Sequence, residues 1–154
     1  MKQLVKLSFL FLLITTFGCN SNDNHAECNS IPEHFIFQFI DKDSGENLFA
    51  NGTYDPKQQI LVTNLKTADI IQLSTLKSED AYSLSIANIG WISEKIAYEI
   101  SFYQSKTIFS LFVDAERISG KCTYTKFNSV EIKNAPFQLD KTTGIYKILI
   151  DTKP

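Results

Sequence analysis

The feature that most constrains the fold is an alternation of apolar and polar residues with a period of two. From residue 96 to residue 102 every second residue is a large apolar one, and the residues between them are Ala, Glu and Ser. Successive side chains of a β-strand point to opposite faces, so this pattern predicts a strand with one buried face and one face in water. Residues 82–86 alternate in the same way, with Ser83 and Ser85 on the expected wet face. Phe35, Phe37 and Phe39 share one face of a third predicted strand.

Further segments rich in apolar and β-branched residues predict additional strands between short turn sequences. They are residues 59–64, 69–75, 107–114, 122–127, 129–133 and 145–151. The last is almost continuously apolar, which predicts a central strand covered on both faces. Turn sequences such as Asn51-Gly52 and Thr143-Gly144 recur at roughly 8–15 residues, and no stretch of a dozen residues has a helical period. We therefore predict an all-β fold, an antiparallel β-sandwich, with a closed β-barrel as the alternative.

One predicted turn has a more particular pattern. Residues 39–48 read FIDKDSGENL, in which Asp41, Ser44, Gly45 and Glu46 resemble the D-x-x-[ST]-G-E-x-L hairpin of transthyretin-like and other immunoglobulin-like extracellular modules. The resemblance implies a β-hairpin in a sandwich of that type. A calcium loop would place the glycine one position later and add a distal glutamate, so we interpret the acids, Asp43 included, as solvated turn residues.

The first residues have the pattern of an export signal. Lys2 and Lys6 precede an apolar stretch that runs from residue 7 to residue 17, interrupted only by Ser and Thr. A secretory signal peptide has a charged start and a short apolar stretch of this kind, whereas a membrane-spanning helix needs about 20 apolar residues. We therefore predict a signal peptide over residues 1–18.

Gly18-Cys19, followed by the polar residues 20–24, resembles the lipobox of bacterial lipoproteins, in the relaxed form of Bacteroidota. Thr16 and Phe17 stand where Leu and a small residue are commoner. In that family the cysteine sulfur takes a diacylglyceryl group before cleavage. The resemblance implies that Cys19 is the lipidated N-terminus and that palmitate-type chains anchor it in the bacterial cell envelope. The implied membrane is the outer one, and the domain could lie on its periplasmic face or on the cell surface. Residues 19–30 are then a polar tether, and residues 31–154 form a single domain.

Three cysteines leave an even pair once Cys19 is lipidated. Cys28 and Cys122 would both lie in an oxidising compartment, where such a pair predicts a disulfide. The alternative is a metal site formed by His25, Cys28 and His34, but the spacing HxxC-x5-H matches no common zinc pattern. We therefore expect a disulfide and no metal.

Charge and motifs exclude several function classes. The net charge is −2, which gives no basic footprint for a nucleic-acid partner. The sequence contains no GxSxG, HExxH, Walker or GxGxxG motif, so we predict no catalytic residues and no cofactor. Trp91 is expected in the core. The alternative is a sugar-binding platform formed by exposed Trp91 and Tyr103.

Three hypotheses for function follow. The first is a non-enzymatic, membrane-anchored envelope lipoprotein that binds, or is accessory to, a protein or glycan partner. The second is a carrier of a small apolar ligand in a barrel lined by the many Phe side chains. The third is a hydrolase that uses the carboxylates of Asp41, Asp43, Asp114 or Glu116, which requires two of them about 5–10 Å apart across a cleft.

Overall fold

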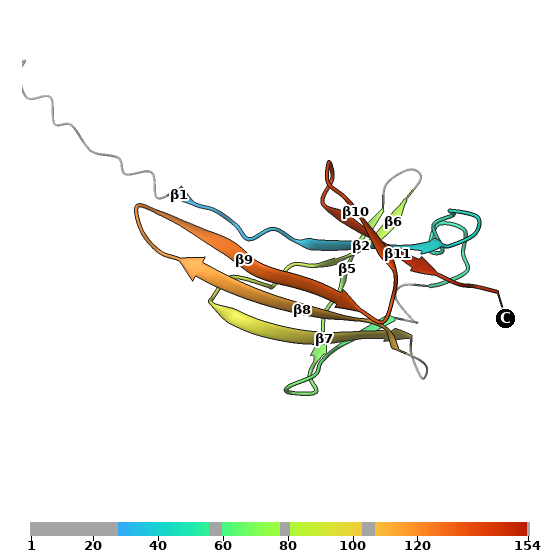
Figure 1. The fold of residues 1–154 in the computed structure, drawn as a ribbon, viewed down its shortest axis with the longest axis horizontal. Coiled ribbons are helices and arrows are strands. Elements are labelled where there is room, and N and C mark those ends of the chain that lie inside the picture. The colour runs from blue at the N-terminus through green and yellow to red at the C-terminus, as the bar shows by residue number, and fades with distance from the viewer. Residues whose placement is uncertain (1–27, 56–59, 78–80, 103–106, 154) are drawn as a thin grey trace, which may run out of the picture.

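The computed structural model describes residues 28–55, 60–77, 81–102 and 107–153 (Figure 1), and within these ranges the chain forms strands and no helix. The all-β prediction is therefore confirmed. The strands are β1 (Cys28–Asn29), β2 (Phe35–Asp41), β3 (Ile60–Asn64), β4 (Ile70–Ile71), β5 (Ser74–Lys77), β6 (Tyr82–Ile86), β7 (Glu94–Phe102), β8 (Thr107–Ile118), β9 (Cys122–Lys133), β10 (Phe137–Asp140) and β11 (Ile145–Ile150).

The strands form two sheets. One has six strands in the order β1-β9-β8-β7-β3-β4, and the other has five in the order β10-β11-β2-β6-β5. Most neighbours are antiparallel, but β1 is parallel to β9 and β2 is parallel to β11. The prediction of purely antiparallel pairing is therefore wrong. Parallel neighbours need a long connection, and most of the domain lies between β2 and β11 in the chain.

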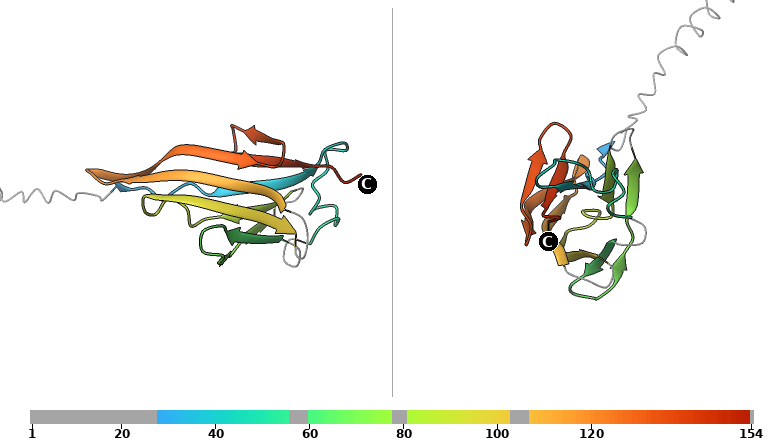
Figure 2. Two further views of the ribbon diagram at one scale, coloured as in Figure 1. Left: turned by 60° about the horizontal axis from the view of Figure 1, so that its bottom comes forward. Right: turned by 90° about the vertical axis from the view of Figure 1, so that its right-hand side faces the viewer.

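Aromatic side chains join the two sheets. Phe37 and Phe39 of β2 are almost fully buried, and their rings lie 5.1 Å and 6.2 Å from the ring of Phe109 on β8. Phe35 contacts Phe127 of β9 with 5.3 Å between ring centroids. The three Phe side chains share one face of β2, as predicted, and they are buried in the core together with residues of the other sheet. Figure 2 shows how the two sheets are arranged.

Two strand predictions need correction. Residues 69–75 do not form one strand, because β4 pairs with β3 in the six-stranded sheet and β5 pairs with β6 in the other. The chain changes sheets between them. Residues 122–127 and 129–133 are instead one strand, β9, whose register against β8 shifts between Asp114 and Ala115. A bulge of this kind lets a strand continue through a local irregularity in its pattern. Strand β10 was not predicted.

The expected wet face of β6 is buried. Ser83 and Ser85 are only 6% and 2% exposed. Strand β6 lies between β2 and β5, so the short serine side chains stand beside longer ones such as Ile36 and Leu76. Alternation identifies a polar face but does not decide whether water reaches it. Strand β11 lies between β10 and β2, so its predicted position inside a sheet is confirmed, but its predicted burial on both faces is not. Ile148 is fully buried there, and the other β11 side chains are half-buried.

Candidate functional site

The described fold begins at a covalent link to one end of β9. A disulfide joins Cys28 of β1 to Cys122, the first residue of β9, with 4.7 Å between their Cα atoms. This is the pairing that the cysteine count predicted. The backbone N–H of Ser30 donates to the carbonyl oxygen of Thr123 at 2.9 Å, so the expected tether, residues 19–30, ends inside a hydrogen-bonded pairing. Cys19 lies outside the described residues.

Strand β9 carries the chain from this end of the domain to the other. It contains 12 residues, which span about 40 Å at a rise of about 3.3 Å per residue. Beyond its far end, residues 134–136 cross from the six-stranded sheet to β10 of the other sheet. Asn134 takes the left-handed backbone conformation there, with φ of 71°.

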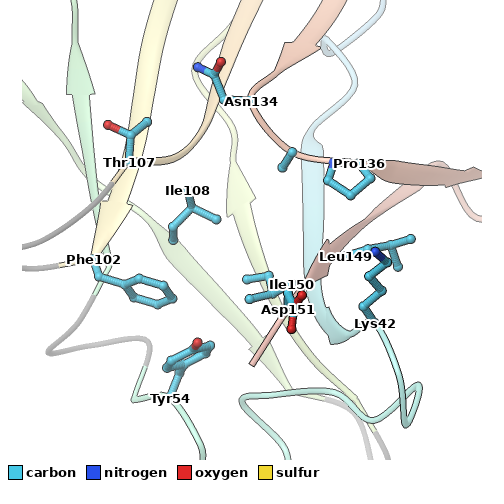
Figure 3. A pocket seen from close by; sticks show the side chains of 11 residues that line it. Lys42, Tyr54, Phe102, Thr107, Ile108, Asn134, Pro136, Leu149, Ile150 and Asp151 are labelled. Carbon is cyan, nitrogen blue, oxygen red and sulfur yellow. The ribbon is translucent and has the colours of Figure 1, made fainter. Parts of the chain in front are cut away.

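A pocket of about 380 Å³ opens at this far end (Figure 3). Its walls come from the ends of β7 and β11, the start of β8, the crossing after β9, and two residues of the chain that follows β2. The lining residues are Lys42, Tyr54, Phe102, Thr107, Ile108, Asn134, Ala135, Pro136, Leu149, Ile150 and Asp151. The volume falls in the range of small-ligand sites.

The pocket has an apolar floor and a polar rim. The rings of Tyr54 and Phe102 contact each other at an angle of 41°, with 4.3 Å between their centroids. Ile108 and Ile150 also line the pocket and pack against the core. Lys42 and Asp151 bring a cation and an anion to the rim. Burial, and secondarily the charge of Asp41, raises the pKa of the Tyr54 hydroxyl, which therefore stays protonated and able to donate a hydrogen bond. Such a surface can hold a ligand by ring contact and hydrogen bonds.

The turn that positions Lys42 is held by Asp41. Its carboxylate accepts hydrogen bonds from the Thr152 hydroxyl and from the backbone N–H groups of Asp43 (3.0 Å) and Ser44 (2.7 Å). These bonds, the one from Thr152 first, lower the pKa of Asp41 from 3.8 to about 2. The N–H of Lys42 also donates to the carbonyl oxygen of Ile150 at 2.8 Å. The carboxylate is thus ionised at neutral pH and fixes the shape of one pocket wall.

The four carboxylates of the hydrolase hypothesis are divided between the two sheets. Asp41 and Asp43 lie at the end of β2, and Asp43 forms an ion pair with Lys153 at 2.7 Å. Asp114 and Glu116 lie on β8 of the other sheet, where Asp114 pairs with Lys95 at 3.0 Å. Glu116 accepts a hydrogen bond from the Asn128 side-chain amide at 3.4 Å. The structure does not bring the two pairs of carboxylates to one cleft.

The residues of the metal alternative are also separated. Cys28 is in the disulfide, His34 lies in the link between β1 and β2, and His25 falls outside the described residues. Among the residues that the structure describes, no group of three His, Cys, Asp or Glu side chains could hold a metal ion.

Trp91 is not a core residue. It is 48% exposed and lies in the link between β6 and β7, with the Arg117 guanidinium 5.8 Å from its ring centroid. The core prediction is wrong because Trp91 follows Gly90 beyond the end of β6, at the edge of the core. Tyr103, its expected companion in a sugar platform, lies outside the described residues.

Sequence reasoning missed the pocket. Its residues come from six separate parts of the chain, and only the folded chain brings them together. No helix in the described ranges is long and apolar enough to cross a membrane. No family model, curated protein or solved structure matches the chain.

Proposed function

We propose that this chain is a non-enzymatic, lipid-anchored protein of the bacterial cell envelope, and that it binds a protein or glycan partner at the end of the domain farthest from its anchor. The export signal and the residues around Cys19 support the anchor. The bond between Cys28 and Cys122 suits an oxidising compartment outside the cytoplasm. For the fold we propose a sandwich of the immunoglobulin or transthyretin type. For the location we propose the outer membrane, to which the lipid anchors the domain.

The observation that carries the binding role is the position and lining of the pocket. Eight residues, 20–27, separate the predicted anchor, Cys19, from Cys28, and the nine residue steps between the two cysteines reach about 30 Å at most. The disulfide therefore stays near the membrane, and the pocket lies about 40 Å farther along β9. An aromatic floor with polar groups on its rim suits a sugar ring or a peptide side chain.

The filled core favours this function over the carrier. A carrier needs an empty apolar interior, whereas the rings of Phe37, Phe39 and Phe109 pack against one another and are almost fully buried. These three Phe side chains thus fill the space between the sheets that a ligand of the carrier type would occupy.

Photo-crosslinking in intact cells tests the binding role. A benzophenone amino acid is placed at Asp151 on the pocket rim and, as a control, at exposed Lys126 on β9. We expect a reproducible crosslinked species from position 151 that is absent from position 126. Equal products at both positions, or none at position 151, would contradict binding at the pocket.

Metabolic labelling tests the anchor. We expect radioactive palmitate to label the wild-type protein and the Cys122→Ser variant but not the Cys19→Ala variant. Label that persists in Cys19→Ala would refute lipidation at this residue.

A further inference from the structure

We propose that the end of the domain around the disulfide rests on the bilayer, with Trp91 and Ile92 in the headgroup region. This inference rests on the proposed lipid anchor at Cys19. It assigns a membrane-contacting surface that fixes how the domain stands on the membrane and where its pocket faces.

Three large apolar side chains are exposed at this end. Ile31, Trp91 and Ile92 are 69%, 48% and 66% exposed. Arg117 brings their segments together, because its guanidinium donates to the Ser30 carbonyl oxygen at 2.9 Å and lies over the Trp91 ring. Adjacent exposed apolar residues of this size mark an interaction surface, and Trp is enriched where a protein meets the membrane interface.

The exposed loop is held rigidly in place. The Thr125 hydroxyl donates to the carbonyl oxygen of Gly90 at 2.6 Å, and the N–H of Gly90 donates to the Glu94 carboxylate at 2.7 Å. On the other side of Trp91, the Ser93 hydroxyl accepts from the N–H of Arg117 at 2.9 Å. Trp91 and Ile92 therefore project from a fixed support, so their exposure is built into the fold.

The cations at this end complement phosphate groups. The guanidinium of Arg117 contacts uncharged oxygens of Ser30, Thr125 and Asn29, and it forms no ion pair among the described residues. Lys121 stands in the turn between β8 and β9, next to the disulfide. A Trp ring with an adjoining cation matches a headgroup layer, which is apolar below and phosphate-rich above.

The length of the chain before Cys28 selects the bilayer as the occupant. Residues 19–27 allow at most about 30 Å between the acylated cysteine and the disulfide, and Arg117 bonds directly to Asn29 beside it. The apolar surface is thus the part of the domain that the anchor holds nearest to lipid. In Figure 1 the chain end marked C lies at the opposite end of the long axis from β1.

The chain contains its own reporter for this contact, because Trp91 is its single tryptophan. The acylated full-length mature protein is reconstituted into vesicles of phosphatidylethanolamine and phosphatidylglycerol, with or without bromine on the acyl chains. We expect brominated vesicles to remove about half of the Trp91 fluorescence, since interfacial Trp lies at the headgroup level within reach of the chains.

A matched control moves the reporter to the far end of the domain. The double variant Trp91→Phe, Lys153→Trp carries its tryptophan beside the turn after β2, where Lys153 is exposed. We expect bromolipid to leave this fluorescence unchanged. Equal quenching of both proteins would overturn the proposed orientation.

The remaining outcomes separate the inference from the anchor. If mass spectrometry shows acyl chains and the protein floats with the vesicles, but bromolipid does not quench Trp91, the anchor stands and the membrane contact is overturned. Trp91 that is shielded from aqueous acrylamide yet unquenched by bromolipid would instead indicate a protein partner or a second copy on this surface, which also overturns it. An unacylated mature protein would overturn both proposals.

Discussion

The side chains of Asp41 and Thr152 join the turn after β2 to the segment after β11. The Thr152 hydroxyl donates to the Asp41 carboxylate, which also accepts from the backbone N–H groups of Asp43 and Ser44. These residues border the pocket wall that Lys42 and Asp151 form. The ionised state of one exposed carboxylate thus helps to define the candidate site.

This contact predicts a loss of stability in acid. The pKa of Asp41 is lowered from 3.8 to about 2 in the folded protein. Its ionised carboxylate therefore contributes fully to the stability of the fold at pH values above the pKa of the unfolded chain, and this contribution is lost as the pH falls from about 4 to about 2. Hydrogen bonds from the turn at Thr142 and Thr143 lower the pKa of Asp140 as well, with the same sign. We expect the melting temperature to fall across this window, and to fall less in Asp41→Asn. An equal fall in both proteins would contradict the assignment to Asp41.

A second variant tests the cause of the shift. Thr152→Val removes the hydrogen bond that contributes most to it, so the pKa of Asp41 should rise toward 3.8. A ¹³C NMR titration of the Asp41 carboxyl carbon measures this directly. An unchanged titration midpoint would show that the turn N–H groups alone hold the carboxylate.

The disulfide predicts a large stability effect. Cys28 and Cys122 are 94 residues apart, and closing a loop of that size stabilises a fold by up to about 4–5 kcal/mol through the entropy of the unfolded chain. We expect the Cys28→Ser, Cys122→Ser double variant to unfold at a lower urea concentration than the wild type, and the reduced wild type to match it. Equal midpoints for the oxidised and reduced wild-type protein would contradict this.

Local pattern was sufficient to predict most strands but not their neighbours. The alternation in residues 96–102 and the aromatic face of β2 reflect burial along one strand, which a sequence records directly. Which strands lie side by side depends on the whole chain, so the parallel pairing of β2 with β11 had no local signal. The division of residues 69–75 between two sheets was missed for the same reason.

The site was less predictable than the fold. The disulfide could be predicted from the number of cysteines. The pocket, in contrast, depends on the contact between Tyr54 and Phe102, which are far apart in the sequence. Trp91 was assigned to the core from its residue type, whereas its exposure depends on Gly90, which turns the chain away from β6 with φ of 89°. Residue type predicts only the average burial of a side chain, so it could not identify a tryptophan that the fold leaves exposed.

Gly90 should tolerate no side chain. A Cβ there would lie 2.6 Å from the Cγ2 of Thr125, and the backbone already has a φ that L-residues rarely adopt. We expect Gly90→Ala to lower the free energy of unfolding by about 2–3 kcal/mol. Gly52 is the matched control, with a φ of 80° but nothing within 4 Å of its Cβ position, so Gly52→Ala should cost only about 1 kcal/mol. Equal losses in the two variants by urea denaturation would show that close packing against β9 contributes nothing.

Two serines on β6 should respond in opposite ways to loss of their hydroxyls. The Ser83 hydroxyl accepts a buried hydrogen bond from the Gln38 side-chain amide at 3.1 Å, so Ser83→Ala would leave that amide unpaired and cost about 1–3 kcal/mol. Ser85 is equally buried, but its hydroxyl has no hydrogen-bond partner in the described part of the chain. Ser85→Ala therefore removes a buried polar group at no loss of a bond and should be neutral or stabilising. Urea midpoints of the two variants decide this, and a larger loss for Ser85→Ala than for Ser83→Ala would contradict the hydrogen-bond assignment.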